Sequence, residues 1–254
     1  MRRSATALAL AGALLFGGAC ARAAKPKTSS EVLLTERMAQ VLLRDGQPLD
    51  AERAFREALK YDPKNPEVHD GLGVALMMQG RFRDAVVSLD KAVSLAPENG
   101  SFRNNRGVAR MELGQYGEAG EDFNAAERSP NPDDRIAAAI NRGRLHQRAG
   151  EFEAAEKEFA NALARDPKSY AATIGRGAAR ESKGDLEGAA EDYLAAIKLD
   201  ATSADANLRL GLCLVTLKKP DLGRRYLQRA VELDPSGDTG AKARLLLDQS
   251  RKPS

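Results

Sequence analysis

The feature that most constrains the fold is a pattern of about 34 residues that recurs along the chain, a period typical of stacked helix pairs. Its clearest copy runs from Pro66 to Asn99 and has the slots Leu72, Gly73, Leu76, Gly80, Phe82, Ala85, Leu89, Ala92 and Pro97. Similar slots recur before and after this copy. Six copies are predicted, at residues 32–65, 66–99, 100–135, 136–169, 170–203 and 204–237.

Each slot has a physical reason. The first Gly and the two Ala of a copy lie where paired helices cross too closely for a larger side chain. The second Gly ends the first helix in a left-handed backbone conformation. Pro after Asp ends the second helix, because the residue before Pro is pushed out of helical geometry. Since one helix pair cannot bury its own apolar stripe, neighbouring pairs must stack on a continuous core.

These slots stay in register over about four-fifths of the chain and resemble those of the tetratricopeptide repeat family. The resemblance implies an all-α fold, a right-handed superhelical solenoid of six helix-turn-helix repeats. A short C-terminal capping helix is expected within residues 238–254, where Leu245, Leu246 and Leu247 would cover the last open apolar face.

Two copies depart from the pattern. Between the third and fourth, the register slips by two residues in the segment from Ser129 to Asp134, and its prolines and acids predict an exposed turn. The sixth copy replaces its second Gly by Lys218-Lys219-Pro220. Pro220 fits the first turn of a helix, so the sixth repeat is retained.

The amino terminus has the layout of a secretory signal. Arg2 and Arg3 precede an apolar run from Ala5 to Gly18 that is too short to span a membrane, which predicts a signal peptide over residues 1–19. Cys20 follows Gly17-Gly18-Ala19 and resembles the lipobox of bacterial lipoproteins, although this family prefers Leu where Gly17 stands.

The resemblance implies that Cys20 becomes the first residue of the mature chain and carries the lipid, palmitate included. Because Ala21 rather than Asp follows it, the implied location is the periplasmic side of the outer membrane. Cleavage after Ala21-Arg22-Ala23 would instead release a soluble periplasmic protein. Residues 20–31 show no apolar periodicity and are predicted to form a flexible tether.

Composition argues against several classes of function. The formal net charge is only +3, with basic and acidic residues interleaved at helical spacing, so neither a nucleic-acid nor an acidic-lipid partner is indicated. No small-molecule substrate is expected either. His69 and His146 lie in different repeats, and no metal-ligand spacing or phosphate-binding Gly loop occurs. We therefore expect no enzyme activity, metal or cofactor. Cys213 is interpreted as a small buried hydrophobic residue.

Charged residues recur at two slots of the middle repeats. The third, fourth and fifth repeats carry Arg106, Arg142 and Arg176 before the first Gly slot, and Asp122, Glu158 and Asp192 before the aromatic slot. The other three repeats carry neither charge. Since Arg occurs only where an acid occurs, these residues are predicted to form structural ion pairs within each repeat. A further column of Arg110, His146 and Arg180 lies one turn on and could share those acids or reach solvent.

The resemblance also implies a binding surface, because tetratricopeptide arrays bind through the concave groove lined by the first helix of each repeat. The groove slots fall on Asp70, Val74, Met77, Asn104, Val108, Met111, Ile140, Arg144, Ile174, Ala178, Leu208 and Leu212. This largely apolar strip suits an apolar or amphipathic segment of a partner protein. Alternatively, the strip packs helix against helix. The family's clamp for chaperone carboxylates requires Lys at the slots where this chain has Glu36 and Asp70, so the clamp is not expected here.

The whole layout resembles tetratricopeptide lipoproteins of bacterial envelope machines. Two groups fit: the type IV pilus pilotin family, which promotes outer-membrane assembly of a secretin, and the lipoprotein of the tight-adherence pilus system. The expected function is a non-enzymatic protein-interaction scaffold, held to the membrane by its lipid, with a secretin subunit as the expected partner. The alternatives are an envelope adaptor that recruits a periplasmic protease or peptidoglycan enzyme, and an unanchored periplasmic binding module.

Overall fold

The computed structural model describes residues 29–249, and within this range the chain is entirely helical, as the repeat pattern predicts. Twelve helices form six antiparallel pairs, and a thirteenth follows the last pair. Their bounds are α1 Ser29–Arg44, α2 Pro48–Leu59, α3 Pro66–Met78, α4 Phe82–Leu95, α5 Gly100–Glu112, α6 Tyr116–Ala126, α7 Pro132–Arg148, α8 Phe152–Arg165, α9 Tyr170–Lys183, α10 Leu186–Leu199, α11 Ala204–Thr216, α12 Pro220–Leu233 and α13 Asp238–Gln249.

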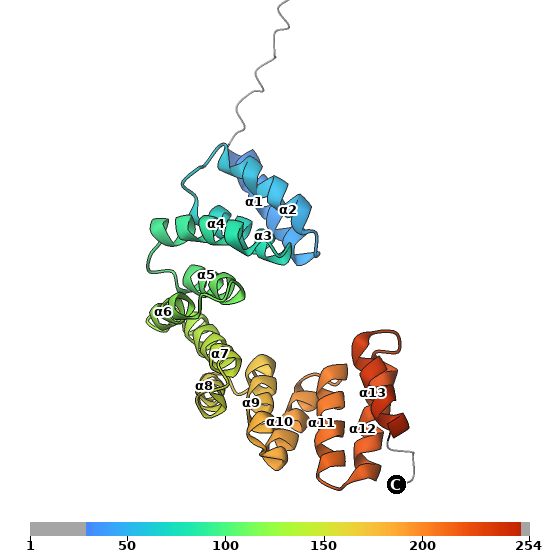
Figure 1. Ribbon diagram of the computed structural model, residues 1–254. Coiled ribbons are helices and arrows are strands. Elements are labelled where there is room, and N and C mark those ends of the chain that lie inside the picture. Colours follow the sequence, from blue (N-terminus) through green and yellow to red (C-terminus); the bar gives the residue numbers. More distant parts are fainter. Residues whose placement is uncertain (1–28, 250–254) are drawn as a thin grey trace, which may run out of the picture.

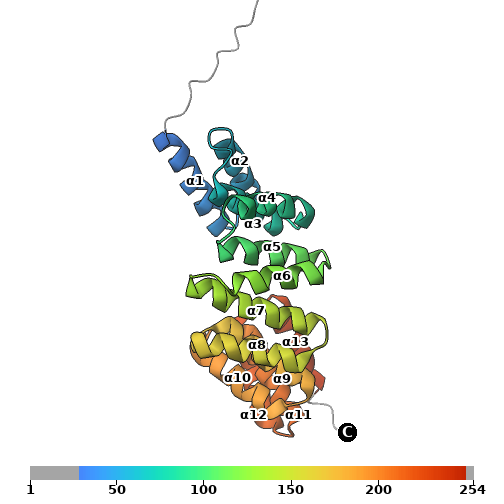
Figure 2. The same ribbon diagram turned by 90° about the vertical axis from the view of Figure 1, so that its left-hand side faces the viewer.

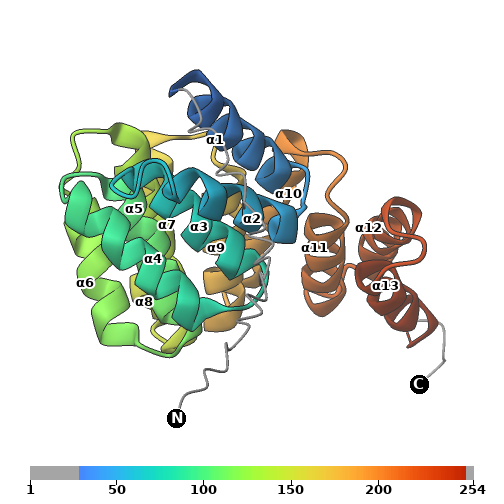
Figure 3. The same ribbon diagram turned by 90° about the horizontal axis from the view of Figure 1, so that it is seen from above.

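Consecutive pairs stack into a curved solenoid (Figure 1). The first helices of the repeats, α5, α7 and α9, lie on the inner side of the curve, and α6 and α8 lie on the outer side. Figure 2 shows the successive pairs as layers. Viewed from above, α11, α12 and α13 lie to one side of the earlier layers (Figure 3). The arrangement gives the molecule an inner surface made by first helices and an outer surface made by second helices.

The inner helices begin at short polar residues that cap them. Asn65, Asn99, Asn131, Ser169 and Ser203 each accept a hydrogen bond from a backbone N–H in the first turn of α3, α5, α7, α9 and α11. Such a cap satisfies a donor that would otherwise lack a partner inside the helix. The caps fix where each repeat starts.

The small slots of the repeat are contact points between helices. A β-carbon on Gly107 would lie 2.4 Å from the Phe123 ring, and one on Gly143 would lie 2.8 Å from the Phe159 ring. The Ala slots are fully buried; Ala85, Ala119 and Ala155 expose 0% of their surface. These residues allow the first and second helices of a repeat to approach closely around one aromatic side chain.

The fourth repeat begins earlier than the sequence predicted. Helix α7 starts at Pro132 rather than near 136, because Asn131 caps it and Pro132 suits its first turn. The preceding turn is exposed at residues 130–133, as predicted, but its two ends are buried. Ser129 and Asp134 are 5% and 8% exposed, and the Ser129 hydroxyl donates a 2.6 Å hydrogen bond to the Asp134 carboxylate. This bond closes the turn, so the two extra residues extend α7 backwards.

The two ends of the solenoid differ. At the carboxyl end, Leu246 and Leu247 of α13 pack against Leu227 and Ala230 of α12, while Leu245 is exposed. At the other end, α1 leaves apolar side chains uncovered, with exposed fractions of 67% for Leu34, 61% for Met38 and 49% for Val41. The stack is therefore covered at one end only, within the part of the chain that the structure describes.

Several sequence predictions lie outside the described residues: the signal peptide at 1–19, the lipid on Cys20, most of the tether at 20–31 and the tail at 250–254. Among the described helices, none combines the length and the apolar character needed to cross a lipid bilayer.

Candidate interaction surface

The twelve residues predicted for the groove all lie on inner helices, but they are not equally accessible. Arg144 and Leu212 are exposed, and most of the others are half-buried. Asn104 and Met111 are only 4% and 3% exposed, which contradicts their placement on an open groove floor. The Asn104 amide donates a 2.9 Å hydrogen bond to the carbonyl oxygen of Asp134, so this side chain links α5 to α7.

Much of the apolar strip packs between helices. Ile140 contacts the clusters around Ala139 and Phe159, Ile174 contacts the cluster around Tyr193, and Leu208 contacts the cluster around Leu227. Met77 packs in the same way on the first repeats. The strip is thus partly the helix-to-helix packing considered as the alternative to a groove.

Two pockets remain open to a partner on the inner surface. The larger, of about 440 Å3, lies between α5 and α7; it is lined by Val108, Met111, Glu112, Arg144, Gln147 and Arg148. The smaller, of about 240 Å3, lies where α13 meets the sixth repeat; it is lined by Leu212, Val215, Leu227, Leu246 and Gln249. The sequence analysis missed Glu112, Gln147 and Arg148. Gln147 occupies the slot that Met77 and Met111 hold in earlier repeats, and Glu112 and Arg148 each directly follow such a slot.

The inner surface is acidic at its first two repeats. Asp70 of α3 accepts hydrogen bonds of 2.9 and 3.1 Å from the Asn105 amide of α5. Burial, opposed by this hydrogen bond and reinforced by Glu67, raises the pKa of Asp70 to about 6. Burial and the charges of Glu67 and Asp62 also raise the pKa of Glu36. A negative surface of this kind disfavours the carboxylate tails that the family's chaperone clamp holds.

Polar contacts join the inner helices to one another. The Arg148 guanidinium of α7 lies 2.5 Å from the Glu112 carboxylate of α5, and Gln147 donates to the carbonyl oxygen of Gly175 in α9. Arg209 of α11 lies 3.5 Å from Glu181 of α9. Because each contact spans two repeats, the inner surface is held in shape before any partner binds.

The charged slots lie between the first and second helices of a repeat, and all three expected ion pairs are present. Arg106 and Asp122 approach to 2.5 Å, Arg142 and Glu158 to 2.8 Å, and Arg176 and Asp192 to 2.5 Å. The Asp122 and Asp192 side chains are only 3% exposed, so each buried charge depends on its arginine partners for compensation.

These pairs extend into a chain of charges along the solenoid, which we call the ion-pair ladder. Arg106 also reaches Asp90 of the preceding repeat, Arg142 reaches Glu127, and Arg180 bridges Glu156 and Asp192; Arg110 shares Asp122. Lys183 and Arg180 lower the pKa of Glu156 through their hydrogen bonds. His146 instead pairs with Glu151 near the surface, at 2.6 Å.

The described residues offer little for catalysis. No group of three His, Cys, Asp or Glu side chains within 29–249 could hold a metal ion. Cys213 is 1% exposed, and burial raises the pKa of its thiol to about 11, so the thiolate is scarce at neutral pH.

Similarity to solved structures is extensive in fold and low in sequence. Pseudomonas aeruginosa PilF gives a TM-score of 0.71 at 17% identity, over 87% of this chain and 98% of PilF. PilW, a type IV pilus biogenesis factor, gives 0.76 at 20% identity, over 87% of this chain and 100% of PilW. A chain of the APC/C Cut9–Hcn1 hetero-tetramer gives 0.74 at 18% identity, but this protein spans only 43% of it.

Sequence comparison identifies the repeats independently. No curated protein sequence matches the chain. Three family profiles do match, each described as a tetratricopeptide repeat, at residues 42–104, 140–204 and 204–236. Together they cover more than half of the 254 residues. The chain therefore belongs to the tetratricopeptide repeat family.

Proposed function

We propose that this protein is an envelope scaffold that assists assembly of a pilus secretin in the bacterial outer membrane. The observation that carries the proposal is the whole-length match to PilF and PilW, since 98% and 100% of those chains are covered. A match to Cut9–Hcn1 covers less than half of that chain and concerns the fold alone. The export signal and lipobox predicted from the sequence support a location in the envelope.

In this proposal the partner contacts the inner surface between α5 and α7. The pocket there combines apolar walls, Val108 and Met111, with the polar groups of Arg144 and Gln147. An apolar side chain of an unassembled secretin segment would enter the pocket, and its backbone or acidic groups would meet Arg144. The inner surface is preformed, so binding would not require the solenoid to order itself first.

The test uses a photoreactive amino acid in place of Arg144, which is exposed and lines the pocket. The full-length protein is crosslinked in its native membranes, and captured proteins are identified by mass spectrometry. A matched probe at Lys157, exposed on the outer helix α8, serves as control. Capture of a secretin subunit at Arg144 and not at Lys157 is expected.

A second variant separates contact from folding. Val108→Asp places a charge in the same pocket and should abolish secretin capture by a crosslinker at Arg144 while helical circular dichroism is retained. Met111 is unsuitable for this purpose, because it is 3% exposed and an aspartate there would disturb the core. Capture of a periplasmic protease or a peptidoglycan enzyme instead of a secretin would overturn the proposal in favour of an adaptor.

We also propose that Cys20 carries the lipid that places the scaffold at the outer membrane. Growth with an alkyne analogue of palmitate should label the wild-type protein, and Cys20→Ser should be unlabelled and move to the soluble periplasmic fraction. Several acyl chains on one cysteine give stable anchoring, whereas a single chain gives only marginal binding. Equal labelling of both proteins would contradict the lipid anchor.

A further inference from the structure

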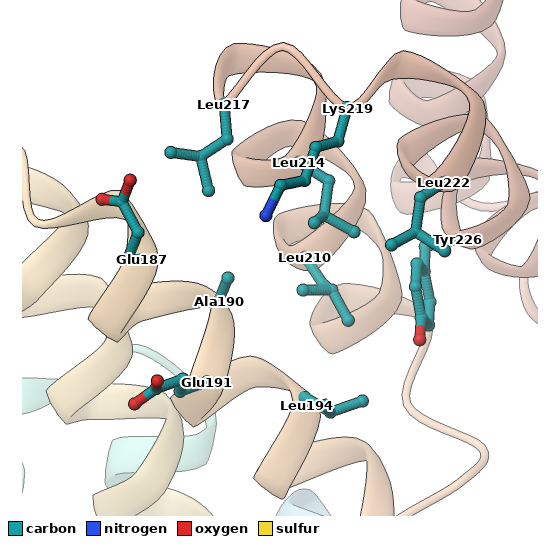
Figure 4. Close-up of a pocket in the computed structure, with 10 residues that line it drawn as sticks. All are labelled: Glu187, Ala190, Glu191, Leu194, Leu210, Leu214, Leu217, Lys219, Leu222 and Tyr226. Carbon is teal, nitrogen blue, oxygen red and sulfur yellow. The ribbon is translucent and has the colours of Figure 1, made fainter.

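A pocket of about 250 Å3 opens on the outer side of the solenoid, away from the inner surface. It lies between the second helices of the last two repeats, α10 and α12, and α11 forms its floor (Figure 4). Leu210 and Leu214 of α11 and Leu217, which directly follows that helix, line the floor, and Tyr226 and Leu222 of α12 line one wall. The pocket is large enough for a bulky apolar side chain.

The repeat before it shows what usually occupies this place. One repeat length upstream, the positions of Leu210, Leu214 and Leu217 hold Arg176, Arg180 and Lys183 of α9. Those basic side chains pair with carboxylates of the flanking outer helices: Asp192, Glu156 and Glu153 lie 2.5, 2.8 and 3.9 Å from a basic nitrogen. In the sixth repeat, three leucines replace three basic residues, and Tyr226 replaces the acid that corresponds to Asp192.

One acid of the outer helix is lost, because Ala190 stands where α8 has Glu156, but two acids of α10 lie beside the pocket. Glu187 and Glu191 of α10 stand on the rim of the pocket, both exposed, and neither side chain forms an ion pair or hydrogen bond within residues 29–249. Glu187 corresponds to Glu153, the acid that lies near Lys183 in the previous repeat. Lys219 on the opposite rim is the one basic residue that lines the pocket, so the rim carries a net negative charge.

We propose that this outer pocket binds a basic amphipathic segment of a partner protein. The segment would insert an aliphatic or aromatic side chain against Leu210 and Leu214, and its flanking arginine or lysine side chains would meet Glu187 and Glu191. The partner thereby supplies the positive charge that α9 supplies one repeat earlier, together with the apolar group that the leucine floor requires. This site is separate from the inner surface and does not depend on the secretin proposal.

The test begins with a displayed library of short random peptides selected on the full-length protein. Ala190 of α10 points into the cavity, so Ala190→Leu should fill it with an apolar side chain and spare the fold (Figure 4). The matched control is Ala195→Leu on the same helix, which lines a different pocket between α8 and α10. Urea unfolding of both variants checks that the fold is retained.

Selected peptides should combine a bulky apolar residue with neighbouring arginine or lysine. The affinity of a synthesised peptide for Ala190→Leu should fall by about tenfold, while Ala195→Leu binds as the wild type does. Glu187→Gln with Glu191→Gln should weaken binding by about threefold at low salt and leave it unchanged at high salt.

Two results would overturn the proposal. One is a selection that yields no binding peptide, or peptides whose affinity is the same for Ala190→Leu as for the wild type. The other is self-association of the wild type, measured by sedimentation, that Ala190→Leu abolishes, since a second copy of the chain would then cover the pocket in place of a different partner.

Discussion

Arg142 differs from its two counterparts in the number of bonds it makes to its acid. Arg106 and Arg176 each hold an aspartate through both Nε and Nη2, at 3.0 and 2.5 Å. Arg142 reaches Glu158 through Nη2 alone, at 2.8 Å, and its buried Nε has no hydrogen-bond partner. The longer glutamate side chain therefore leaves a buried donor unsatisfied, which costs free energy.

Glu158→Asp should give the fourth repeat the geometry of the third and fifth. We expect the free energy of unfolding to rise by about 1 kcal/mol, because the second bond satisfies Arg142 Nε. Urea denaturation measures the change. The reciprocal variant, Asp192→Glu, should lower the free energy of unfolding by a similar amount, and a stabilising effect of both changes would contradict this interpretation.

The raised pKa of Asp70 predicts that the stability of the protein depends on pH. Its pKa is about 6 in the folded protein against 3.8 for a free aspartate, so the folded state binds the proton more tightly. The stabilisation from protonation is therefore fully present below pH 3.8 and is lost as the pH rises through 6. Since Asp70 is partly exposed, we expect Asp70→Asn to raise the free energy of unfolding at pH 7 by about 1 kcal/mol.

The comparison is made by thermal or urea unfolding at pH 7 and pH 4. The gain from Asp70→Asn should nearly vanish at pH 4, where the wild-type carboxyl is protonated. Glu98→Gln, at an exposed turn, is the control and should show no such dependence. A gain of the same size at both pH values would show that the titration of Asp70 is not the cause.

At the scale of residues, the sequence predicted ion pairs better than exposure. A repeat that has an arginine at the slot of Arg106 also has an acid at the slot of Asp122, and a repeat without the arginine lacks the acid. An ion pair between the two slots explains this co-occurrence. Exposure of Met111 depends on the angle at which α7 crosses α5, which is set by packing over several helices. No local pattern encodes that angle, so the burial of Met111 could not be predicted from its slot.

The turn between the two helices of each repeat contains one residue with a left-handed backbone conformation. In five repeats this residue is Gly, but in the sixth it is a residue that rarely adopts this conformation. Gly46, Gly80, Gly114, Gly150 and Gly184 have φ between +69° and +86° in the first five repeats. Lys218 takes this position in the sixth repeat with φ +59°, where its β-carbon crowds the backbone. The sequence showed the missing Gly, but only the backbone shows that the turn is kept.

Lys218→Gly should therefore stabilise the turn between α11 and α12. We expect a gain of about 1 kcal/mol in the free energy of unfolding, measured by urea denaturation. Lys219→Gly is the matched control, because Lys219 has φ −115° and gains nothing from glycine. A gain from Lys219→Gly equal to that from Lys218→Gly would point to a general loop effect.

The fourth repeat shows why element boundaries were harder to predict than element type. Counting residues from the repeat period placed its start at 136, whereas Asn131 and Pro132 begin α7 four residues earlier. The cap and the first-turn proline are local signals that the sequence contains. What it lacks is the Ser129–Asp134 hydrogen bond, which forms only when the turn closes onto α7.

At the scale of the whole molecule, the unequal ends predict where unfolding starts. Because contacts in a solenoid are between neighbours, a repeat with one uncovered side is less stable than an internal one. Leu34 and Met38 leave α1 with an uncovered apolar side, while α13 covers α12. Hydrogen exchange of the full-length protein should therefore be faster in α1 and α2 than in α11 and α12.

Truncation after residue 237 removes α13 and should speed exchange in α11 and α12 while leaving α5 and α7 nearly unchanged. Mass spectrometry of peptic fragments gives the comparison. Uniform exchange along the intact chain would mean that the solenoid opens as a single cooperative unit and that its end repeats are not less stable than the others.

The ion-pair ladder also makes the middle of the protein divisible into interchangeable units. Four basic residues of the ladder join an acid of their own repeat to an acid of the preceding repeat: Arg106, Arg110, Arg142 and Arg180. If residues 142–175 were excised, Arg176 would follow Asn141 in the chain and inherit Glu127, while keeping Asp192. A five-repeat protein shortened in this way should still fold, because Arg176 would have an acid on each side of the new junction. The architecture can therefore accommodate the gain or loss of whole repeats.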